Sequence, residues 1–94
     1  MRKPDAQALQ RQCDAFNAAC APGGRIMFKR DFVDEPYEAR TRSEAYVLSG
    51  HSPVVFVEGV SGCYHLTHCE PITENQSPAD AAVALKGRLA RLHA

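Results

Sequence analysis

A four-residue run, Val54 to Val57, is the sequence feature that most constrains how this chain can fold. The run is apolar and mostly β-branched, so a strand formed there is expected to be buried on both of its faces. The segment Gly50–Pro53 before it is interpreted as a turn, and the segment Gly59–Gly62 after it as a hairpin loop. The pattern therefore predicts a β structure built from short strands and tight turns.

Further short strands are predicted on both sides of this run. Residues 25–30 alternate in polarity, which places Ile26 and Phe28 on one face of a strand. Residues 31–37 are acidic and include a proline, so they are interpreted as a long loop. Four more pieces are expected: one long strand or a bent pair at 38–49, a returning strand at 63–66, a helical turn at 67–70 and a closing edge strand at 71–73.

This order of pieces predicts a short-stranded SH3-like β-barrel over residues 25–73. Short strands joined by one long loop and tight hairpins, with a helical turn before the last strand, are typical of that architecture. The expected fold class is mainly β with two flanking helices (α+β), arranged as a single domain over residues 1–94. Architecture of this kind does not by itself indicate a function.

Two amphipathic helices are predicted to flank the barrel. The first covers residues 4–20 and ends where Ala21–Gly24 supplies a proline and two glycines. The second covers residues 78–93 and begins with Ser77 as a capping residue and Pro78 at the first helical position. Each carries one apolar stripe: Leu9, Cys13, Phe16 and Cys20 on the first, and Ala82, Leu85, Leu89 and Leu92 on the second.

The stripes leave two packing arrangements open. Both helices could cover the barrel of their own chain, or one of them could pack on a partner chain and form a homodimer. No apolar run approaches the length of a membrane span, and the first residues lack the apolar stretch of a secretory signal. We therefore expect a cytoplasmic protein with no membrane partner, whose four cysteines are free thiols.

Charge is unevenly distributed, although eleven basic and eleven acidic residues cancel. Residues 43–85 contain five acids and no Lys or Arg, whereas both ends of the chain have a net positive charge. An acidic centre argues against a general nucleic-acid binder. The alternation also predicts a local basic patch. Arg25 and Lys29 share one face of the first strand, and Arg40 and Arg42 share one face of a later strand. If these two strands are neighbours, four cations gather on one wall, which could contact phosphates. The alternative is a solvated face with cross-strand ion pairs.

Several short segments in the centre of the chain resemble small proteins of unassigned function that phages and prophages of bacteria encode. The matching segments lie within residues 38–71: Arg40–Ala45, Gly50–Val55, Val57–Gly59, Gly62-Cys63 and Leu66–Pro71. The resemblance implies a bacterial mobile-element origin, a bacterial host cell and a short barrel. It includes no catalytic motif, and neither helix falls within it.

Reactive side chains gather in one segment, with Cys63, His65, His68 and Cys69 close in sequence. These four, with His51 from another loop, are candidates for a zinc site, because zinc takes three or four Cys, His or carboxylate ligands. The segment lacks the paired C-x-x-C that would indicate zinc most strongly. A Cys69–histidine dyad is a second chemical possibility. We expect no catalytic residue, no bound metal and no cofactor.

Tyr37 and the acidic stretch from Asp31 to Glu38 form a candidate protein-binding edge, suited to a basic peptide or protein surface. The leading hypothesis is a non-enzymatic protein-interaction module of phage or mobile-element origin, with an unidentified protein partner. Inhibition or regulation of a host complex is one form of it. The alternative is a nucleic-acid-binding accessory protein that uses the basic strand face, and a small metal- or thiol-dependent enzyme is the third.

Overall fold

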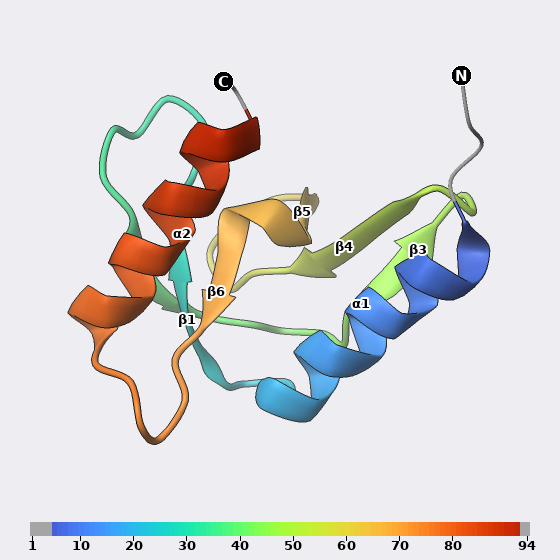
Figure 1. Cartoon of the computed structure of the whole chain (residues 1–94), viewed down its shortest axis with the longest axis horizontal. Coiled ribbons are helices and arrows are strands. Elements are labelled where there is room, and N and C mark those ends of the chain that lie inside the picture. The colour runs from blue at the N-terminus through green and yellow to red at the C-terminus, as the bar shows by residue number, and fades with distance from the viewer. Residues whose placement is uncertain (1–4, 93–94) are drawn as a thin grey trace.

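The computed structural model describes residues 5–92, which form two helices, six short strands and one 3₁₀ turn (Figure 1). The helices are α1 (Ala6–Ala19) and α2 (Pro78–Leu92), one at each end of the chain. Between them lie β1 (Arg25–Phe28), β2 (Tyr37–Arg40), β3 (Tyr46–Leu48), β4 (Ser52–Phe56), β5 (Cys63–His65), the 3₁₀ turn η1 (Leu66–His68) and β6 (Cys69–Pro71).

The strands form two three-stranded antiparallel sheets, in the orders β2-β1-β6 and β3-β4-β5. The predicted closed barrel is therefore wrong for the described residues. On one side the sheets meet through an isolated bridge between Thr41 and Val57, and on the other η1 separates β5 from β6. Strands of three to five residues end before a continuous ladder can run round the core.

The main core lies between the two sheets and is covered on one side by α1. Ile26 and Phe28 from β1 face Val55 and Val57 across it, and Phe16 of α1 belongs to the same buried cluster. The side chain of Asn17 also ties α1 to the second sheet, because it donates to the carbonyl oxygen of Ala45 and accepts from its N–H. The first helix is thus a structural part of the core.

The second helix packs on the opposite face of the first sheet. Met27, which points away from Ile26 and Phe28 on β1, forms a second buried cluster with Ala81 and Leu85 of α2. Figure 1 shows α2 alongside β1 and β6, with α1 on the far side of the sheets. Both faces of β1 are therefore buried, one beneath each helix.

The two predicted helices are confirmed in the described residues, and a capping side chain explains where each helix starts. The side chain of Asp5 accepts from the N–H of Gln7 and begins α1, and Ser77 accepts from Asp80 to begin α2. The predicted ends at residues 4 and 93 lie outside the described part. On α2 the predicted stripe is correct through Leu89, but Leu92 is exposed because the helix extends beyond the sheet.

Three local predictions need correction. The turn before β4 covers residues 49–51, so Pro53 is not in a turn but is buried inside β4 opposite Val47. The 3₁₀ turn begins at Leu66, one residue before the predicted helical turn. The last strand is Cys69–Pro71, because Cys69 and Glu70 pair with β1, and the proposed strand at 71–73 begins two residues too late. In the described part of the chain, neither helix is long and apolar enough to cross a membrane.

Candidate functional site

The most exposed large apolar side chain of the described residues is Phe32, in the loop that joins β1 to β2. This loop, residues 29–36, is called the Phe32 loop below. Phe32 is fully exposed and has a φ of 66°, in the left-handed region that a bulky residue rarely adopts. Val33 beside it is also exposed. The loop extends from the sheet next to α2 (Figure 1).

The Phe32 loop is attached to the rest of the molecule at both ends. At its start, the N–H of Lys29 donates to the carbonyl oxygen of His68 over 2.9 Å. Near its end, Glu35 forms an ion pair with Lys86 of α2. Between them, the N–H of Val33 donates to the carbonyl oxygen of Arg30 over 3.2 Å and closes a turn. The loop that presents Phe32 therefore has defined anchors in η1 and α2.

Aromatic rings pack beneath the base of this loop. Phe28 contacts the rings of Tyr37 and Tyr64 edge-on, with centroid separations of 5.7 and 4.7 Å. Tyr37, a candidate binding residue, lies on β2 with its side chain partly exposed. Tyr37, the first residue after the loop, is thus partly packed, whereas Phe32 in the middle of the loop is fully exposed.

The predicted basic face is only partly assembled. Arg25 and Arg40 are direct cross-strand neighbours on β1 and β2. Arg25 donates to both carboxylate oxygens of Glu38, at 2.7 and 3.1 Å, and this hydrogen-bonded pair raises the pKa of Arg25 and lowers the pKa of Glu38. Arg40 donates to the carbonyl oxygen of Gly23 at 2.8 Å. Both cations therefore have partners within the fold.

The other two predicted cations also have partners within the chain. Arg42 donates to the carbonyl oxygens of Val57 and Val60 and lies over the ring of Phe56, 4.6 Å from its centroid. This arginine ties the segment after β2 to the loop after β4. Lys29 donates to the carbonyl oxygen of Arg30 at the start of the Phe32 loop. The structure thus brings Arg25 and Arg40 together but uses Arg42 to join the two sheets.

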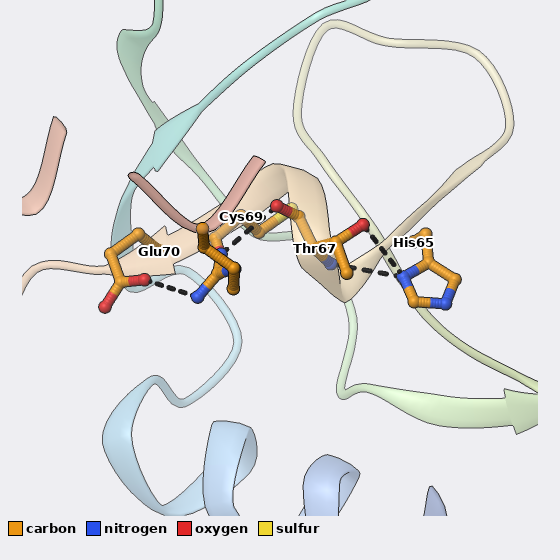
Figure 2. A network of polar contacts seen from close by, with 5 residues as sticks. His65, Thr67, Cys69 and Glu70 are labelled. Carbon is orange, nitrogen blue, oxygen red and sulfur yellow. Dashed lines mark hydrogen bonds and ion pairs between the residues drawn. The ribbon is translucent and has the colours of Figure 1, made fainter. Parts of the chain in front are cut away.

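The predicted Cys/His cluster is dispersed by the fold. Cys69 points into the main core, where burial raises the pKa of its thiol to about 12. The Nδ1 atom of His65 accepts from the N–H of Thr67 and caps η1, and His68 bonds to the backbone of Lys29 (Figure 2 shows the first of these). His51 lies on the exposed turn before β4. Within residues 5–92, no three His, Cys, Asp or Glu side chains gather closely enough to hold a metal ion.

A residue that the sequence analysis did not single out, Arg88 of α2, anchors the region around η1. Its guanidinium donates to Glu70 at 2.7 Å and to the carbonyl oxygens of Thr67 and Cys69 at 3.2 and 3.0 Å (Figure 2). A shallow groove of about 360 Å³ lies beside it, between α1 and β6, and Phe16 contributes to its wall. The sequence contains no signal for this network, because Arg88 lies eighteen to twenty-one residues away from its three partners.

The sequence reasoning also does not single out Phe32, although the stretch that contains it is a candidate protein-binding edge. The signal was present in the sequence, since Phe32 and Val33 are an apolar pair within an acidic stretch that contains no strand-like alternation. Large apolar residues in a loop either fold back onto the core or remain exposed, and only the structure distinguishes these outcomes. No family model, curated protein or solved structure matches this chain.

Proposed function

We propose that this chain is a non-enzymatic protein-interaction module whose docking element is the Phe32 loop. One observation carries the proposal: Phe32 is fully exposed in left-handed backbone, on a loop that is anchored to both η1 and α2. An exposed phenylalanine contributes nothing to the core, and burying its ring against a partner is worth about 2 kcal/mol. Aromatic side chains, including phenylalanine, are enriched in protein interfaces relative to the rest of the surface.

The proposed partner is a protein with an apolar pocket in a basic surface. Asp31 and Asp34 flank the apolar pair, and within residues 5–92 neither of them forms an ion pair. The acidic side chains would steer a basic surface toward the loop, and Phe32 would fill the pocket. Inhibition or regulation of a bacterial host complex by a phage or prophage protein remains one form of this proposal, based on the sequence resemblance.

The order of the strands supports an open, SH3-like arrangement of the two sheets. The strand order, the long first loop and the 3₁₀ turn before β6 all agree with that interpretation. In such an arrangement the first loop lies at one end of the sheets, where a partner can reach it. Self-association through the exposed residues of α2 is a separate hypothesis.

The test begins by placing the photoreactive residue p-benzoylphenylalanine at position 32 of the whole chain in bacterial cells. Val83, an exposed apolar residue of α2, is the matched control position. The crosslinked partner is then purified, and its affinity is measured for the unaltered chain, Phe32→Ser and Val83→Ser. We expect Phe32→Ser to weaken binding by about thirty-fold, a typical interface hot-spot effect, and Val83→Ser to leave it unchanged. Equal binding by all three proteins would contradict the proposal.

The nucleic-acid alternative has less support from the geometry. Arg25, Arg40 and Arg42 all bond to groups of this chain, which reduces what they can offer to phosphates. Fluorescence anisotropy with short single- and double-stranded DNA separates the two hypotheses. Binding that falls steeply between about 50 and 200 mM salt and is lost in Arg40→Glu would favour nucleic acid over the Phe32 loop.

A further inference from the structure

A reciprocal pair of hydrogen bonds joins the start of the Phe32 loop to η1. The N–H of Lys29 donates to the carbonyl oxygen of His68 over 2.9 Å, and Nδ1 of His68 lies 2.8 Å from the carbonyl oxygen of Lys29. A carbonyl oxygen only accepts, so Nδ1 of His68 must carry a proton. Both the backbone and the side chain of His68, the last residue of η1, therefore bond to the backbone of Lys29, the first residue of the Phe32 loop.

Tyr64 of β5 supports the same loop one step further along. Its hydroxyl accepts a long hydrogen bond, 3.4 Å, from the N–H of Asp31, the residue directly before Phe32. Its ring packs edge-on against Phe28 and against the imidazole of His68, with centroids 4.7 and 5.6 Å away. Tyr64 and His68 therefore form one contiguous support beneath the loop.

We infer that Tyr64 and His68 are positioning residues that hold the Phe32 loop in its binding conformation. This inference rests on the proposed function. A loop that must be ordered when it binds loses affinity through the entropy of ordering, whereas an anchored loop has already lost that freedom. The two residues would then affect the affinity for the partner without touching it, since they act through the backbone of residues 29–31.

Three substitutions in the whole chain separate the hydrogen bond from the ring packing. His68→Phe keeps a ring against Tyr64 but removes the donor. His68→Asn removes the ring but keeps an N–H donor near the position of Nδ1. Tyr64→Phe removes only the hydroxyl that accepts from Asp31. Tyr46→Phe is the matched control, because Tyr46 lies on β3 and its ring packs against Phe56 rather than against the Phe32 loop.

The first readout is backbone order, measured by amide hydrogen exchange and ¹⁵N relaxation. Loss of one net hydrogen bond should raise the exchange rate of the affected amides by about five-fold. In His68→Phe these are the amides of Lys29 and Asp31, and in Tyr64→Phe the amide of Asp31. His68→Asn should retain most of the protection, and Tyr46→Phe should not alter it. An imidazole ¹⁵N spectrum of the unaltered chain should show a protonated Nδ1 on His68. Unchanged loop exchange in both His68→Phe and Tyr64→Phe would overturn the inference.

The second readout is the affinity for the partner identified through position 32. His68→Phe and Tyr64→Phe should weaken binding several-fold and His68→Asn should restore most of it. If the loop becomes mobile while affinity is unchanged, the positioning role in binding is disproved and the proposed function stands. If Phe32→Ser itself leaves binding unchanged, the proposed function fails, and this inference falls with it.

Discussion

Arg88 of α2 and Glu70 of β6 form a 2.7 Å ion pair that fastens the C-terminal helix to the last strand. The side chain of Glu70 is only 18% exposed and that of Arg88 33%. Arg88 reaches two further carbonyl oxygens at η1, so one side chain connects the helix, the strand and the 3₁₀ turn. The same turn supports the Phe32 loop through His68. Helix packing and loop geometry are therefore linked through η1.

Removing this ion pair should destabilise the protein substantially. Arg88→Met deletes three donated hydrogen bonds and leaves Glu70 poorly solvated, so we expect a loss of about 2 kcal/mol in the free energy of unfolding. Urea denaturation followed by circular dichroism measures this change. The control Arg91→Met, at an exposed position one turn nearer the C-terminus, should change the free energy by less than about 0.5 kcal/mol. Equal effects of the two substitutions would contradict the role of Arg88.

The left-handed backbone at Phe32 predicts an unusual order of stability for two variants. Phe32→Gly and Phe32→Ala both remove the ring, but only glycine adopts a φ of 66° without steric cost. We expect the glycine variant to be more stable than the alanine variant by about 1 kcal/mol. Val33, which has no positive φ, should show the reverse order when replaced by the same two residues. Thermal unfolding of the four variants tests both statements.

The four thiols should differ widely in reactivity. Cys13, Cys20 and Cys69 are buried, whereas Cys63 is partly exposed on β5. Burial raises the pKa of Cys13 and Cys20 as well as that of Cys69, so very little reactive thiolate is present at neutral pH. Iodoacetamide followed by mass spectrometry should modify Cys63 first in the native protein and all four thiols only in denaturant. Rapid labelling of Cys69 in the native protein would contradict the burial of its side chain in the main core.

The Arg25–Glu38 pair predicts the sign of a small pH effect on stability. The pKa of Glu38 is lower in the folded chain than its ordinary value of 4.5, chiefly because Arg25 donates hydrogen bonds to the carboxylate. As the pH falls through 4.5, the unfolded chain therefore binds more protons at Glu38 than the folded chain does. The stabilisation from this pair is present above pH 4.5 and is lost below it. In Glu38→Gln, the free energy of unfolding should fall less steeply as the pH is lowered below 4.5. An unchanged slope in urea titrations between neutral and acid pH would contradict this assignment.

Local signals predicted the elements whose causes are local. The cap at Ser77 with Pro78 located the start of α2 to the residue, and the apolar spacing of α1 identified its buried face. Pro53 led to a wrong prediction because a proline usually marks a turn or an edge strand. Here Pro53 lies within β4, opposite Val47 of β3. The pairing of β4 with β5 ends one residue later, at Val54 opposite His65, so no residue of β5 needs a hydrogen bond from the position of Pro53.

For this protein, sequence alone determined the two helices, the class of fold and the buried run of β4, because each depends on residues close together in the chain. Tertiary structure alone decided whether the sheets close, which cations are neutralised and which side chains remain exposed. The hydrogen-bond partners of Arg42 and Arg88 are fifteen or more residues away, and the exposure of Phe32 depends on the path of its whole loop. Such relationships arise when distant segments pack, and no local periodicity encodes them.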